Sequence, residues 1–348
     1  MKRIVILCTV FVASLLAVAL TAAALCWNSA LEEGQRDKSY WSAVRNIQPG
    51  ELPQVRFLGD STLMSSKIAT YPYRLGRQLA GHVEVKTTAL IGGSLWESYF
   101  LTGRAADVRP RVVALVVNLR TLSATADRPD YQDLASQLPA EELLRALALP
   151  LHEIGMSLPR LLLLQSLRVD RLREGIWAAG GFRKQLSRAH PIWIAPEPIL
   201  DLPGELGRRR AFRHYDTPVH AHQGTLQAMQ ASLSLLERRG IATLVVISPI
   251  PIDALRSSGL AKPEQMAERI ALIRNLAEAR GARVVDLHDL LLPEGFADLV
   301  GHFSKPGSRA VARSLRAPLI ELLESRDVTI PAHLKKSLLG TPREAVER

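Results

Sequence analysis

The sequence predicts an α/β fold built on a mostly parallel sheet, and three observations lead to this prediction. Continuous apolar runs at 112–117 and 242–247 are typical of strands that are covered on both faces, as in parallel sheets. Segments with helical character alternate with the strands, at 63–81, 223–239, 263–280 and 307–324. Such alternation predicts β-α-β units. The chain is 47% apolar but only 5% aromatic, which favours helices and aliphatic strands over an all-β fold.

The remaining strands are shorter. The first predicted strand of the sheet is 55–58, directly before a glycine, and the last is 283–287. Between His82 and Thr88 apolar and polar residues alternate, which predicts a half-buried or edge strand.

The N-terminal segment predicts a membrane anchor. Lys2 and Arg3 precede an uncharged stretch at 4–27, which exceeds the roughly 20 apolar residues needed to cross a bilayer. The small residues at 22–24 leave a cleaved signal peptide open as an alternative. Because flanking basic residues stay in the cytoplasm, we expect a single-pass protein of the cytoplasmic membrane whose main domain lies in the periplasm or outside the cell.

The rest of the chain divides by composition. Residues 1–27 form the expected anchor and 28–52 a polar stalk or linker. The main domain is expected at 53–325. It is interrupted at about 128–222 by an insertion with leucine-rich helical stretches, which we interpret as a lid, a substrate platform or a docking surface. The basic tail at 326–348 is expected to be loosely ordered.

Charge and cysteine content narrow the function. The net charge is +10, but no nucleic-acid-binding module is present, so no nucleic-acid partner is expected. A basic surface also suits anionic lipid or acidic polysaccharide, although arginines scattered over a surface explain the charge more simply. Cys8 and Cys26 both lie in or beside the apolar N-terminal run, so no disulfide framework is expected in the main domain.

Residues suited to acyl-transfer chemistry follow the predicted strands. Ser61 stands in the turn Gly59-Asp60-Ser61-Thr62, where Asp60 can support the turn and an exposed hydroxyl lies near a helix start. Asn118 directly follows the run at 112–117 and can point its amide at a reacting oxygen. His302, on a loop before the last helix, is the residue type that most often serves as a base for serine.

A glycine pair completes the pattern. Gly92 and Gly93 follow the second strand, where a glycine lets the backbone approach a ligand and donate an N–H. Each of these features alone is also explained by an ordinary turn or a surface loop.

The order of serine, glycine, asparagine and histidine resembles the four blocks of the SGNH (GDSL) hydrolase superfamily, across about 53–322. The resemblance implies a flavodoxin-like three-layer α/β/α sandwich. It implies Ser61 as the nucleophile and His302 as the general base. It also implies an oxyanion hole formed by the N–H of Ser61, by Gly92 or Gly93, and by Asn118. No cofactor is implied.

Two departures from the family pattern bear on the site. The family usually has Asp three residues before the histidine; here Leu299 stands there and Asp298 is one place earlier. Either Asp298 is the triad acid or a backbone carbonyl orients His302. The third block reads Val-Asn-Leu-Arg instead of Gly-x-Asn-Asp, which, with the anchor, is more similar to extracytoplasmic SGNH proteins that modify cell-surface polymers.

The predicted function is therefore that of a serine-dependent esterase or O-acyltransferase acting on acyl esters of cell-surface polysaccharide through an acyl-enzyme. A membrane-embedded partner that donates acyl groups would fit a transferase. One alternative is a lipid esterase or lysophospholipase. Another is a non-catalytic module of a membrane-bound complex.

A metal-dependent enzyme is a further alternative. Imidazoles and a carboxylate can bind zinc, and four such side chains are close in sequence within the insertion: His214, Asp216, His220 and His222. The segment lacks a regular helical spacing, so a polar loop explains it more simply, and no metal site is predicted.

Overall fold

The computed structural model describes residues 47, 54–63, 70–79, 81–90, 95–122, 224–257, 261–297 and 301–339. All of them belong to one compact unit, residues 43–129, 152–155 and 192–348. The expected anchor and the insertion at about 128–222 lie outside the described residues. Of the expected linker only Ile47 is described, and it is buried. Within the described ranges, no helix is both long and apolar enough to cross a membrane.

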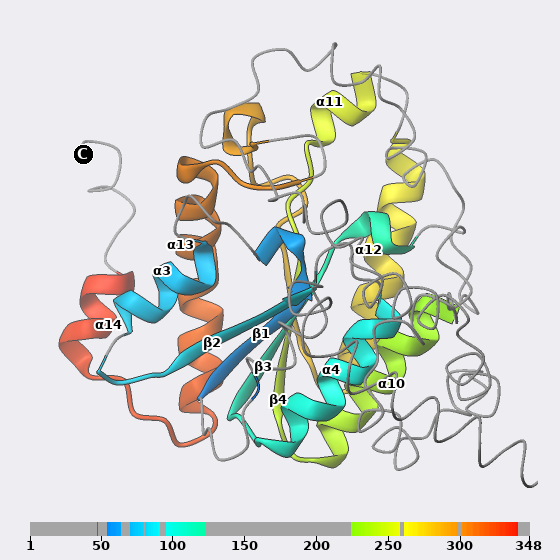
Figure 1. Ribbon diagram of the computed structural model, residues 1–348. Coiled ribbons are helices and arrows are strands. Elements are labelled where there is room, and N and C mark those ends of the chain that lie inside the picture. Colours follow the sequence, from blue (N-terminus) through cyan, green and yellow to red (C-terminus); the bar gives the residue numbers. More distant parts are fainter. Residues whose placement is uncertain are drawn as a thin grey trace, which may run out of the picture. The chain divides into compact units, whose positions relative to one another are not determined.

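Five parallel strands form a sheet within the described part of the chain, in the order β2-β1-β3-β4-β5 (Figure 1). They are β1 (Val55–Asp60), β2 (Val85–Leu90), β3 (Val112–Val117), β4 (Ala242–Ile247) and β5 (Arg283–Asp286). This is the flavodoxin-like order, in which the direction of strand addition reverses between β1 and β3. Ligands of such folds bind in the crevice at the carboxyl ends of the strands beside this switch point.

Helices cover both faces of the sheet (Figure 1). One face carries α3 (Tyr71–Gln78), α13 (Lys305–Glu324) and α14 (Ala332–Leu339). The other carries α4 (Leu95–Asp107), α10 (Gly224–Arg238) and α12 (Pro263–Glu278). The connections contain η1 (Ser61–Leu63), η2 (Leu119–Leu122), α11 (Ile252–Ser257) and η7 (Pro293–Gly295). A parallel sheet with helices on both faces confirms the predicted α/β fold.

The central strands β1, β3 and β4 are buried along their whole length, as continuous apolar runs predict. Arg56 in β1 is charged but is also fully buried, and it donates from Nη1 to Thr88 Oγ1 of β2 at 2.9 Å. The alternating run at 82–88 contributes to the edge strand β2, as expected. Because Leu58 pairs with Leu115, β1 and β3 end beside each other, at Asp60 and Val117.

Three helices were not anticipated from the sequence, namely α4, α11 and α14. In α4 the aromatic residues Trp96, Tyr99 and Phe100 are all buried, although the helix also contains a glycine that weakens its local signal. The expectation of a loosely ordered tail after Arg326 is wrong up to the end of α14. Ile330 is buried, and Leu334 and Leu338 pack against the core from one face of α14.

Candidate active site

Ser61 begins the 3-10 turn η1, directly after β1. A Cβ at Gly59 would lie 2.9 Å from Leu63 Cδ1 and 3.0 Å from Val116 Cβ, so only glycine lets β1 pass this close to η1 and β3. Asp60 Oδ1 accepts hydrogen bonds from the Thr62 N–H (2.9 Å) and hydroxyl (2.6 Å). These bonds bridge Ser61 and hold it in a tight turn at the end of β1.

Asn118 directly follows β3 and is buried. Its backbone carbonyl accepts from the Thr121 N–H at 2.9 Å and from the Thr121 hydroxyl at 2.6 Å. Its side-chain Oδ1 accepts from the Arg120 N–H at 3.1 Å. With the oxygen held there, the amide NH₂ group points away from the Arg120 backbone N–H, and a Cβ at Gly301 would lie 3.6 Å from Asn118 Nδ2. The amide is thus oriented as a donor on the side of the loop that carries His302.

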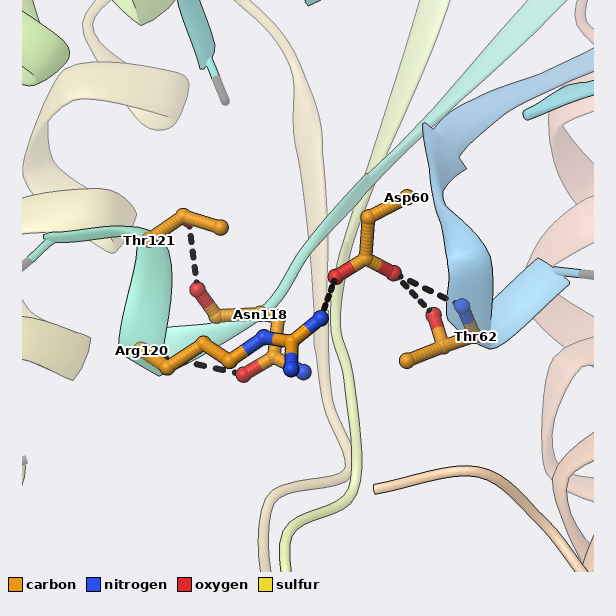
Figure 2. A network of polar contacts seen from close by, with 5 residues as sticks. All are labelled: Asp60, Thr62, Asn118, Arg120 and Thr121. Carbon is orange, nitrogen blue, oxygen red and sulfur yellow. Dashed lines mark hydrogen bonds and ion pairs between the residues drawn. The ribbon is translucent and has the colours of Figure 1, made fainter. Parts of the chain in front are cut away.

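An ion pair joins the turns that follow β1 and β3. Arg120 Nη2 lies 3.0 Å from Asp60 Oδ2, with side-chain exposures of 18% for Arg120 and 6% for Asp60. Figure 2 shows the guanidinium reaching from the Asn118 turn across to Asp60, which faces Thr62 on its other side. The residues on either side of Ser61, Asp60 and Thr62, are therefore connected to Asn118 by one polar network.

Gly301 places the loop before α13 beside Asn118. Its φ of +99° lies in the left-handed region, which favours glycine. A Cβ there would lie 3.6 Å from Asn118 Nδ2 and equally far from the Pro249 carbonyl oxygen. The loop therefore contacts the carboxyl ends of both β3 and β4.

Phe303 attaches the other side of this loop to β1. Its ring packs on Tyr71 with centroids 5.9 Å apart, and Tyr71 packs edge-on against Phe57 of β1 at 5.8 Å. Burial, and secondarily the charge of Asp60, raise the pKa of Tyr71. His302 lies between the two contacts and is 7% exposed. Its backbone therefore lies at the β1/β3 switch point.

The residues after His302 hold the loop in place. Ser304 caps α13, because its Oγ accepts from the Gly307 N–H at 3.3 Å while donating to the Glu294 carbonyl at 2.6 Å. A Cβ at Gly307 would lie 1.9 Å from the Gly295 carbonyl oxygen, so no larger residue fits. The run Ser-Lys-Pro-Gly is thus structural support for the histidine.

The structure brings together three of the predicted site elements, namely the turn of Ser61, Asn118 and the loop of His302. Gly92, Gly93 and Asp298 lie outside the described residues, as does the side chain of Ser61. The alternative metal ligands His220 and His222 also lie outside them. The roles assigned to these groups stay predictions.

A carboxylate–imidazole pair at the end of β5 was not anticipated. His288 Nδ1 lies 2.9 Å from Asp286 Oδ1, and Arg274 Nη2 lies 3.6 Å from Asp286 Oδ2. The hydrogen bond to Asp286 raises the pKa of His288 against the opposing effect of burial. Burial alone would raise the pKa of Asp286, but the hydrogen bonds and charges of His288 and Arg274 outweigh it and lower the pKa.

Two features of the sequence could have indicated the pair of Asp286 with His288 and the role of Arg120. Asp286 is the last residue of a strand and His288 follows two residues later, a spacing that lets the side chains meet across a turn. Arg120 stands in the third block, where the family pattern has no arginine. A charged residue in that place indicates a partner charge nearby, which is Asp60.

Comparisons with known proteins identify no family. No protein-family model matches the chain, and no curated protein matches it. Among solved structures it is similar to a Bacteroides fragilis protein named as an acylhydrolase (11% identity, 81% of this chain and 95% of that one, TM-score 0.42). It is also similar to the acetylxylan esterase Axe2 of Geobacillus stearothermophilus (10%, 80% and 96%, TM-score 0.39). A carbohydrate acetylesterase family member from Sinorhizobium meliloti is similar as well (13%, 78% and 99%, TM-score 0.38).

The structures that resemble the chain therefore include esterases and a protein named as an acylhydrolase. At these TM-scores the likeness carries no weight for the reaction. The fold rests on the strand order, and the candidate site rests on the contacts of this chain's own residues.

Proposed function

We propose that this protein is a serine-dependent esterase or O-acyltransferase that acts on acyl esters of extracytoplasmic polysaccharide. The observation that carries the proposal is the convergence, at the β1/β3 switch point, of the turn of Ser61, the oriented amide of Asn118 and the loop of His302. Serine, histidine and a fixed amide donor are the components that acyl transfer requires.

In the proposed reaction Ser61 Oγ attacks the ester carbonyl while His302 takes its proton. The carbonyl oxygen becomes an oxyanion that accepts hydrogen bonds from the Ser61 N–H, from Gly92 or Gly93, and from the Asn118 amide. When the tetrahedral intermediate collapses, the bond between the carbonyl carbon and the alcohol oxygen breaks, and the alcohol leaves with the proton from His302. Water, or a sugar hydroxyl in a transferase, then releases the acyl group by the reverse steps. Asp298 is the proposed partner that orients His302.

The polysaccharide substrate and the compartment rest on the sequence. The apolar segment at 4–27, with Lys2 and Arg3 before it, supports a domain held outside the cytoplasm at a membrane. The altered third block supports the similarity to proteins that modify cell-surface polymers. A membrane-embedded acyl donor is the proposed partner for a transferase.

A fluorophosphonate probe tests the nucleophile directly. The full chain in detergent is treated with the probe beside a Ser61→Ala control, and adducts are located by intact mass and peptide mapping. One adduct on Ser61, absent from the control, supports the proposal. Absence of an adduct on folded protein, or labelling that persists in Ser61→Ala, contradicts it.

A further inference from the structure

Arg120 has a second binding capacity that the candidate active site does not use. Its guanidinium carries five N–H donors, and Nη2 pairs with Asp60 at 3.0 Å. The Arg120 side chain keeps 18% of its surface exposed. The protein therefore holds the guanidinium at Nη2, beside the Asn118 turn, while part of the side chain stays exposed (Figure 2).

The ion pair with Asp60 fixes the orientation of the guanidinium but uses only one of its nitrogen atoms, Nη2. Both oxygens of Asp60 are engaged, Oδ1 by the Thr62 N–H and hydroxyl and Oδ2 by Arg120. An arginine already held in one orientation loses less conformational entropy when it binds a planar anion. Nη2 carries a second hydrogen, which together with a hydrogen on Nε or on Nη1 forms a fork that matches two oxygens of a carboxylate or phosphate.

We propose that Arg120 binds an oxyanion on the substrate, a carboxylate or a phosphate on the sugar next to the acyl ester. The inference rests on the proposed function, because it places the reacting ester at Ser61. Arg120 pairs with the residue before Ser61 and donates its N–H to Asn118, so a group bound to it lies beside the reacting atoms. The substrate class is thus an ester of an acidic sugar or of a sugar phosphate.

Three matched acetates test the proposal by turnover. They are an acetylated methyl glucoside, the corresponding acetylated methyl glucuronide, and the acetylated methyl glucoside 6-phosphate. With the full chain at low salt, kcat/KM for at least one anionic acetate should exceed that of the neutral acetate about tenfold or more. The better of the two anionic substrates identifies the source of the oxyanion.

Variants assign the preference to Arg120. Arg120→Gln should bring the ratio of anionic to neutral kcat/KM close to one, and Arg120→Lys should keep part of it. Arg239→Gln removes the same charge from an exposed arginine that pairs with Asp107 on α4, so it is the matched control and should keep the full ratio. A ratio near one in the wild type, or an unchanged ratio in Arg120→Gln, overturns the proposal.

A binding measurement separates this inference from the proposed function. Methyl glucuronide and inorganic phosphate, which carry no ester, are titrated calorimetrically into Ser61→Ala and into Ser61→Ala/Arg120→Gln. Binding that weakens about tenfold or more in the double variant supports the anion site even if no acetate is turned over. Equal binding by both proteins, or none by either, overturns the inference, while loss of Ser61-dependent turnover alone contradicts only the proposed function.

Discussion

Asp60 and Asp286 form the same local structure at two different places in the sheet. Each is the last residue of its strand, β1 and β5 respectively. Each accepts from the backbone N–H and the side chain of the residue two positions later, at 2.9 and 2.6 Å for Asp60 and at 3.2 and 2.9 Å for Asp286. Each also pairs with an arginine, at 3.0 Å and 3.6 Å.

The difference lies in the position of the strands. β1 is central and borders the switch point, so Asp60 is 6% exposed and its arginine comes from the turn of Asn118. β5 is an edge strand, so Asp286 is 20% exposed and its arginine comes from a covering helix. The comparison indicates that the carboxylate turn is a structural unit, and that position at the switch point, with serine as the next residue, is what makes one copy a candidate active site.

Replacing the serine in the first turn should have the largest effect. Ser61→Ala removes the proposed nucleophile and should lower kcat on an activated ester at least about a thousandfold. The matched control is Leu287→Met, which alters the equivalent, buried position in the second turn at nearly constant volume and should leave kcat on that ester within about threefold of wild type by our expectation. Comparable losses in both variants would mean that the two turns do not differ in function.

Substitution of His302 and of His288 tests the same difference between the candidate active site and the turn after β5. His302→Ala removes the proposed base and should lower kcat/KM by about 10²- to 10⁴-fold. His288→Ala removes the imidazole at the end of β5, outside the proposed site, and should change kcat/KM far less. A larger loss in His288→Ala than in His302→Ala would transfer the role of base to the second turn.

The central strands and the position of the candidate site could be predicted from the sequence. The runs at 112–117 and 242–247 are apolar throughout because both faces of β3 and β4 are covered, so their pattern alone indicates central parallel strands. The location of the site can be predicted in the same way. Ser61 and Asn118 each directly follow a strand, and parallel strands have their carboxyl ends at the same edge of the sheet.

Long-range packing could not be predicted in the same way. The helix α14 forms because Leu334 and Leu338 pack against the core, and nothing near them in sequence indicates that contact. The pair of Asp60 with Arg120 joins residues 60 positions apart, so each charge alone is an ordinary surface residue in the sequence.

The third prediction concerns Asn118, which has no equivalent in the second turn. Asn118→Ala removes the proposed amide donor and should lower kcat about 10²- to 10³-fold, with a smaller change in KM. Asn118→Asp keeps the Oδ1 acceptor for the Arg120 N–H but replaces the amide donor with a negative charge, so it should be at least as impaired. Activity retained in Asn118→Asp would exclude the amide as a donor to the oxyanion.

The two carboxylates should differ in stability as well. Asp60→Ala leaves Arg120 without its counter-charge at a largely buried position. It should lower the free energy of unfolding by about 2 kcal/mol, less than for a fully buried pair because Arg120 keeps partial exposure. Asp286→Ala, at the more exposed turn, should cost about 1 kcal/mol or less. Urea titration of each full-length variant, followed by tryptophan fluorescence in constant detergent, measures the difference; equal costs would remove the distinction between buried and edge positions.

The smallest effect is a pH dependence specific to the second turn. The pKa of His288 is raised, so its contribution to stability is complete below the ordinary histidine pKa of about 6.5 and is lost as the pH rises through the folded-state pKa. The pKa of Asp286 is lowered, so its contribution is lost only as the pH falls below the ordinary aspartate value of about 3.9. The pair therefore contributes most near pH 5 to 6.

His288→Gln should thus lower the melting temperature most near pH 5 to 6, and the difference from wild type should shrink as the pH rises through the raised pKa of His288. Asp289 and Arg256 also act on His288, raising and lowering its pKa respectively, so Asp289→Asn is a useful second variant that should move the transition to lower pH. At the first turn Thr62 occupies the place of the histidine and does not titrate, so Thr62→Val should shift the melting temperature equally across this range. A pH-dependent shift in Thr62→Val, or a constant one in His288→Gln, would contradict the assignment of this titration to the turn after β5.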